Sequence, residues 1–178
     1  TEGQIRDKAI NSVQSYIDTS DTEKFNGKFR YSKFIGVIDD ADISINSNLT
    51  SVMMRKDFYP QLNSTFYYEV CFQNAFDEDC DDPVLSSTGF RVTEYPNFDV
   101  YVEDRDKKIV LYRLDSVTGE KVVLDRDIGD IDYEKGELKM YALTIIKGSF
   151  FDNRISLRVK PLSNDIKAMR EVYLDVDV

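Results

Sequence analysis

The residues best suited to chemistry form an acidic run: Asp77, Glu78, Asp79, Cys80, Asp81 and Asp82. Oxygen ligands at alternating positions are typical of calcium loops, so the run is a candidate metal site. A helix-loop-helix calcium loop that began at Asp77 would need glycine at its sixth position and glutamate at its twelfth. The sequence has Asp82 and Thr88 there. We therefore expect no metal ligand, with calcium as the alternative interpretation.

The preferred interpretation of this run is a solvated loop that faces a basic surface on a partner protein. Between Gln61 and Asp104 the chain has 10 acidic residues and 1 basic residue, whereas residues 1–60 have 9 and 8 and residues 105–178 have 14 of each. Nearly all of the net charge of −10 therefore belongs to one segment. The candidate partner-binding residues are Asp77, Glu78, Asp79, Asp81 and Asp82.

The composition argues against several classes of function. The chain has no histidine, which excludes catalytic sites that need imidazole. Carboxylate pairs such as Asp39 with Asp40, or Glu69 with a loop acid, resemble a glycosidase acid and base. Adjacent acids point in different directions, however, and the chain has no tryptophan to stack on a sugar. We predict that the protein is not an enzyme and has no catalytic residue and no cofactor.

Partners of two kinds are also not expected. A net charge of −10 disfavours nucleic acid, because phosphates are bound by clustered Lys and Arg. No apolar stretch approaches the roughly 20 residues that span a bilayer, so no membrane role is expected. Two cysteines, Cys71 and Cys80, do not make a disulfide framework and favour a reducing cytoplasm. The start at Thr1 lacks a signal peptide and suggests a fragment of a longer chain.

Apolar spacing predicts two helices at the start of the chain. Ile5, Ala9, Val13 and Ile17 recur at helical spacing, which indicates an amphipathic helix over residues 2–18. A second, shorter helix is expected with Ser32 as its N-cap. A short helical segment is also expected over residues 165–170.

Alternating apolar residues predict strands through the rest of the chain. The predicted strands include Ile43 and Ile45, Val52 to Phe58, and residues 66–76, 90–93, 98–102, 109–114, 122–124, 138–146, 155–159 and 173–178. Turns are expected at residues 104–108 and 118–119. In the strand from Phe66, the side chains of Phe66, Tyr68, Val70 and Phe72 share the face expected to be core.

These elements predict an α+β fold, with two N-terminal helices followed by a mostly antiparallel β-sheet or sandwich. The expected division is a helical start over residues 1–42 and a β-rich domain over residues 43–178, joined as one continuous globular unit.

Three stretches together resemble a known family. The first contains the helix with Ala9-Ile10 and Tyr16-Ile17, then residues 25–39 (FNGKFRYSKFIGVID) and Ile43-Ser44-Ile45. The others are residues 128–138 (IGDIDYEKGEL) and 159–166 (VKPLSNDI). In this order they resemble the C-terminal portion of baseplate J-like proteins and the baseplate wedge protein of T-even phages.

The resemblance implies a structural virion protein of a contractile tail baseplate that links wedge subunits into a ring. Its partners would be other baseplate wedge proteins and copies of itself, as a dimer within the ring, and it would be assembled in the host cytoplasm. The alternatives are a β-rich receptor- or carbohydrate-binding tail module and a metal-dependent enzyme. An aromatic-lined pocket would favour the first alternative and convergent carboxylates with bound metal the second.

Overall fold

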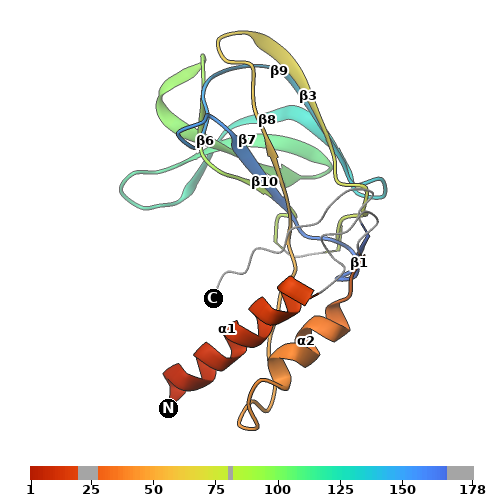
Figure 1. The fold of residues 1–178 in the computed structure, drawn as a ribbon. Coiled ribbons are helices and arrows are strands. Elements are labelled where there is room, and N and C mark those ends of the chain that lie inside the picture. Colours follow the sequence, from red (N-terminus) through yellow and green to blue (C-terminus); the bar gives the residue numbers. More distant parts are fainter. Residues whose placement is uncertain (20–27, 80–81, 168–178) are drawn as a thin grey trace. The chain divides into compact units, whose positions relative to one another are not determined.

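The computed structural model describes residues 1–19, 28–79 and 82–167, which divide into two compact units. Unit 1 contains residues 1–52 and the segment that starts at Ser163, and unit 2 contains residues 53–162. Two helices precede a mostly antiparallel, barrel-like sheet, so the predicted α+β fold is confirmed (Figure 1). The expectation of one continuous globular unit, divided at residue 42, stays a prediction.

Unit 1 is built on a pair of helices, α1 (Glu2–Thr19) and α2 (Tyr31–Asp39). The predicted amphipathic face of α1 packs through Val13, which is buried, and Tyr16, whose ring lies edge-on to Phe34 of α2 at 5.8 Å. The Phe29 ring lies tilted against that of Phe34, with their centroids 5.4 Å apart. The burial of Val13 agrees with the amphipathic face predicted for the first helix.

The start of α2 differs from the prediction. Its N-cap is Arg30 rather than Ser32, and the Arg30 side chain makes no capping bond. The Tyr31 N–H donates instead to Asp165 Oδ1 at 2.8 Å, from a residue 134 positions away. A carboxylate at a helix N-terminus satisfies a free N–H and suits the helix dipole. The first turn of α2 is thus fixed by a distant residue that local patterns do not show.

The predicted strand at Ile43 and Ile45 is wrong. The N–H and the hydroxyl of Ser44 both donate to Asp42 Oδ1, and the Ile45 N–H donates to the Asp42 carbonyl at 2.9 Å. This side-chain turn competes with extended structure, as aspartate commonly does. Ile43 is left fully exposed at 101%.

A short second sheet completes the described part of unit 1. Strand β1 (Lys28–Phe29) pairs antiparallel with β11 (Ile166–Lys167), with Phe29 opposite Ile166. Residues 166–167 are therefore strand rather than the predicted helix, because their main chain is used in this ladder. Residues 168–170 of that prediction, and the strand predicted over residues 173–178, lie outside the described residues.

Unit 2 contains nine strands among its described residues, and the pairings between these strands are antiparallel. The strands are β2 (Met54–Phe58), β3 (Thr65–Cys71), β4 (Leu85–Ser87), β5 (Phe90–Val92), β6 (Tyr95–Arg105), β7 (Lys108–Leu114), β8 (Lys121–Asp132), β9 (Glu137–Lys147) and β10 (Ile155–Val159). The predicted hairpin turn closes at Arg105 opposite Lys108, with Asp106 and Lys107 both at positive φ. That is the two-residue turn that suits strand twist.

Five of these strands pair in a closed ring. β6 pairs with β5, β5 with β9, β9 with β8, β8 with β7, and β7 again with β6. In a ring of antiparallel pairs, the strand direction reverses from each strand to the next. With five straight strands the last and the first would run in the same direction, so the fifth antiparallel pair could not form. The strands must therefore bend. The register shifts place extra residues in β6, opposite Phe90 to Val92, and in β8, opposite Ile109 to Tyr112, and such bulges bend a strand.

Outside the ring, β4 joins β6, β10 joins β4, and β2 joins β10, while β3 pairs with β9. The edges of β2 and β3 meet through side chains, since the Lys56 ammonium donates to the Cys71 carbonyl and the Phe58 ring lies 5.4 Å from that of Tyr68. Side-chain contacts therefore join β2 to β3.

The core of unit 2 is aliphatic, with fully buried residues that include Val92, Val100, Val102, Ile155 and Val159. The β3 face prediction is partly corrected. Phe72 is buried as expected, but Phe66 is exposed near the start of β3, where this strand pairs on one side only, with β9, among the described strands.

Candidate interaction surface

The acidic run lies in the connection between β3 and β4, and its described members have different surroundings. The Asp77 carboxylate pairs with Lys160 at 2.8 Å, and Glu78 pairs with Lys107 at 2.7 Å. Asp79 and Asp82 are exposed and make no ion pair with any residue that the structure describes. Asp81, like Cys80, lies outside the described residues.

The charge imbalance along the chain is reduced in space. Five acids between Gln61 and Asp104 make ion pairs, and almost all of their cations come from later strands and turns. The pairs are Glu69 with Lys139, Asp77 with Lys160, Glu78 with Lys107, Asp99 with Arg91, and Glu103 with Arg105 and Lys121. Self-repulsion in this segment is therefore smaller than the linear count indicates.

Sequence reasoning missed Lys107 and Lys160 as neighbours of the acidic run. Lys107 was in reach of prediction, because it sits in the hairpin turn expected at residues 104–108. Lys160 comes next to the run only through a pairing of distant residues, where Phe76 bridges Pro161 and the Asp77 N–H donates to the Lys160 carbonyl. No local pattern signals that contact.

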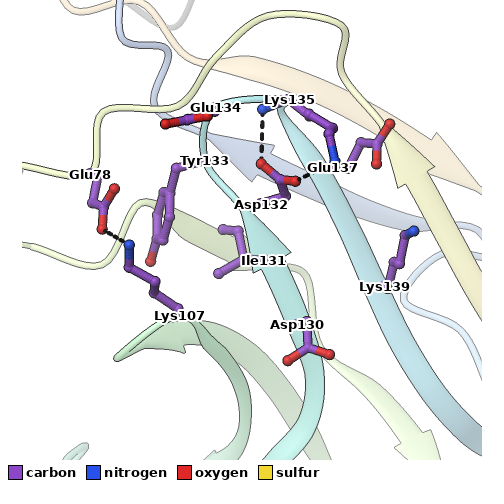
Figure 2. A pocket seen from close by; sticks show the side chains of 10 residues that line it. All are labelled: Glu78, Lys107, Asp130, Ile131, Asp132, Tyr133, Glu134, Lys135, Glu137 and Lys139. Carbon is purple, nitrogen blue, oxygen red and sulfur yellow. Dashed lines mark hydrogen bonds and ion pairs between the residues drawn. The ribbon is translucent and has the colours of Figure 1, made fainter.

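Glu78 and Lys107 also border a shallow depression of about 400 Å³. Its floor is Ile131 and Tyr133, both buried, and its rim is charged (Figure 2). The rim residues are Glu78, Lys107, Asp130, Asp132, Glu134, Lys135, Glu137 and Lys139. The only aromatic residue in this lining is Tyr133, so the depression does not resemble a sugar-stacking site.

Ion pairs stabilise much of this rim. Asp132 accepts the Lys135 main-chain N–H and also pairs with the Lys135 ammonium at 3.1 Å, and these two contacts lower the pKa of the Asp132 carboxyl. Nearby, Lys108 lies between Asp130 at 2.8 Å and Asp127 at 3.0 Å, and hydrogen bonds to these carboxylates raise the pKa of Lys108. Positive and negative side chains therefore stand next to one another along this rim.

Two neighbouring carboxylates of β6, Glu103 and Asp104, are buried. Glu103 is 1% exposed and pairs with Arg105 and Lys121, and the hydrogen bond to Glu103 raises the pKa of Lys121. Asp104 accepts the Leu85 N–H at 2.7 Å and the Tyr133 hydroxyl at 2.6 Å. Burial first, and then this bond, raise the pKa of Tyr133. Each carboxylate has its partners, which is how a buried charge is tolerated.

The described residues contain no group of three or more His, Cys, Asp or Glu side chains arranged to hold a metal ion. The described helices also include none with the length and apolar character needed to cross a bilayer.

Comparison with known proteins gives one family match. Residues 1–57 match the family described as baseplate structural protein gp6, C-terminal domain III. The match covers α1, β1, α2 and the turn after them, which is the whole of the described N-terminal part of unit 1, and reaches into β2. A search of curated proteins found no match. The family match supports a structural protein of a phage tail baseplate.

Proposed function

We propose that this chain is a baseplate wedge protein of a contractile phage tail, related to the C-terminal portion of baseplate J-like proteins. It links wedge subunits into a ring through contacts with other baseplate proteins and with copies of itself. The match of residues 1–57 to the C-terminal domain III of a baseplate structural protein carries this proposal. The protein works in the virion, after assembly in the host cytoplasm, by binding rather than by catalysis.

The structure is consistent with a binding role in two respects. Two ion pairs, Glu78 with Lys107 and Asp132 with Lys135, lie within the charged rim in Figure 2, and the lining contains no aligned nucleophile and base. Unit 2 is held by main-chain ladders and a fully buried aliphatic core, which suits a rigid building block.

Cross-linking mass spectrometry on assembled tails tests the proposal. We expect lysine cross-links from unit 1, for example from Lys8 or Lys33, to other tail proteins and to a second copy of this chain. Absence of the chain from purified tails, or cross-links confined within one chain, would contradict it.

Fewer residues of the acidic run are free to contact a partner in this proposal than the sequence indicated. Asp77 and Glu78 already have cationic partners, so a basic surface on a neighbour would meet Asp79, Asp81 and Asp82. Attraction between such surfaces speeds association and weakens as salt shortens the screening length to about 8 Å.

A matched pair of triple variants tests this contact. Asp79→Asn, Asp81→Asn and Asp82→Asn should slow assembly and reduce its salt dependence. The control changes three exposed acids elsewhere, Asp40→Asn, Glu94→Gln and Glu120→Gln, and alters the net charge equally. If both variants behave alike, the effect is one of net charge and the loop is not a contact site.

A further inference from the structure

One end of unit 2 presents large aromatic side chains to solvent from an ordered hairpin. Phe151 is 107% exposed and Phe150 is 40% exposed in the turn between β9 and β10. Tyr59, which follows β2, is 69% exposed and donates a 3.4 Å hydrogen bond to Asp152 in the same turn. We call Tyr59, Phe150 and Phe151 the aromatic tip.

The turn that carries the aromatic tip is fixed by its own main chain. The Asn153 N–H donates to the Phe150 carbonyl at 2.9 Å, and the Ser149 N–H donates to the Arg154 carbonyl at 3.1 Å. Asn153 has a φ of 60°, and its side chain accepts the Gly148 N–H at 3.2 Å. A Cβ on Gly148 would come within 1.9 Å of the Asn153 carbonyl oxygen, so this close turn requires glycine.

Side chains fix the rings around the turn as well. The Arg154 guanidinium lies over the Phe150 ring at 4.3 Å and donates to Asp57 at 2.9 Å. Phe150 is therefore held from one side, while Phe151 points away without a ring partner among the described residues. A rigid turn loses little conformational entropy when Phe151 is buried by a partner.

The combination of tyrosine, phenylalanine and arginine is typical of the residues that contribute most to protein interfaces. We propose that the aromatic tip is an anchor that inserts into an apolar pocket on a different protein subunit of the assembly. This inference rests on the proposed function for the assembly. The aromatic tip itself belongs to unit 2 and lies outside residues 1–57, which matched a known family.

A second copy of this chain fits the aromatic tip poorly. The tip offers on the order of 400 Å², counting about 200 Å² for each fully exposed aromatic side chain. Two convex tips in contact can bury only each other, which falls short of the roughly 800 Å² that a stable interface needs from each partner, whereas a concave pocket also covers the sides of the turn. Two depressions on the described surface are lined mainly by polar and charged residues, and neither offers an apolar pocket to a phenyl ring.

A lipid surface fits the tip no better. The chain has a net charge of −10, and anionic headgroups attract basic rather than acidic proteins. Close to the tip, the charges of Arg154 and Asp57 cancel in an ion pair, and Asp152 adds a negative charge. A protein pocket with an apolar interior therefore remains the occupant that the chemistry favours.

Site-specific photocross-linking of the native protein in assembling tails tests this inference. A benzoylphenylalanine at position 151 should cross-link to one different tail protein. The matched control places the same group at Val117, which is 91% exposed on another ordered hairpin turn, held by Asp115. The expected yield at position 151 is at least several-fold higher than at position 117.

A substitution gives an independent readout. Phe151→Ser should leave thermal stability unchanged, because the ring is fully exposed, and should lower affinity for the cross-linked partner about 10-fold or more. Val117→Ser should change neither property. Cross-links from position 151 to a second copy, to lipid or to unit 1 of the same chain, or equal yields at both positions, would overturn the inference. If the chain is absent from tails altogether, the proposed function fails first.

Discussion

The two units achieve order by different means. In unit 2 the main chain joins five strands into a ring, and most of the buried side chains on these strands are aliphatic. In unit 1 single side chains set the geometry: Asp165 caps α2, Asp42 forms a turn, and Asn48 donates to the Ile35 carbonyl and to Asp39. The comparison teaches that unit 2 should be sensitive to changes inside its core, whereas unit 1 should respond to single exposed polar residues.

The largest loss of stability is expected when the buried carboxyl group of Asp104, in strand β6 of the ring, is removed. Asp104→Ala leaves the Leu85 N–H and the Tyr133 hydroxyl without a buried acceptor. Each unsatisfied group costs roughly 1–3 kcal/mol, so unfolding free energy should fall by about 2–5 kcal/mol. Urea unfolding followed by tyrosine fluorescence measures this. Asp104→Asn retains one acceptor oxygen and should cost less; equal losses for both variants would contradict the assignment.

Unit 1 should lose stability when its distant cap is removed. Asp165→Ala deprives the Tyr31 N–H of its acceptor and should cost about 1 kcal/mol, the usual value of a helix cap. Hydrogen exchange should become faster at the amides of the first turn of α2, and exchange in unit 2 should stay the same. Ser32→Ala is the control, because Ser32 is not the cap; if it has the larger effect, the non-local cap is wrong.

Features that depend on neighbouring residues could be predicted from the sequence, whereas contacts between distant residues could not. Hairpin turns and the strand over residues 155–159 follow from local alternation and turn residues, and the structure agrees with them. The cap from Asp165 and the pairing of Asp77 with Lys160 join residues far apart in the chain, so local periodicity does not show them. The alternation at Ile43 and Ile45 misled because a turn centred on Asp42 satisfies the same main-chain groups.

The candidate surface was predictable as a sequence segment but not as an electrostatic surface. The acidic run was found from composition, while the number of acids that stay unpaired depends on where Lys107 and Lys160 lie after folding. The closed ring of five strands was also beyond prediction, because its odd number of antiparallel pairs depends on bends at register shifts.

A smaller effect is expected in unit 1 as the pH falls. Hydrogen bonds from Lys8 and then from Ser44 hold the pKa of the Asp42 carboxyl well below its ordinary value of about 3.9. Since the folded pKa is depressed, the stabilisation is present above about pH 4 and is lost as pH falls through the folded pKa. A carboxyl NMR titration should show a low pKa that returns toward its ordinary value in Lys8→Met. An unchanged titration would show that Lys8 is not the cause.

Adding or removing calcium is expected to have no effect on thermal stability. The acidic run lacks the glycine and glutamate of a calcium loop, and Asp77 and Glu78 form ion pairs with lysines. Thermal melts with calcium and with a chelator should therefore coincide. A drop of more than a few degrees with the chelator would restore the calcium interpretation of residues 77–82.

The central claim is a structural place in the tail baseplate, and a density map of the intact tail tests it most directly. We predict density for both units in the baseplate, repeated around the tail axis, with residues of unit 1 in contact with neighbouring subunits. A map in which other proteins account for the whole baseplate, or in which this chain lies at a fibre tip, would contradict the claim.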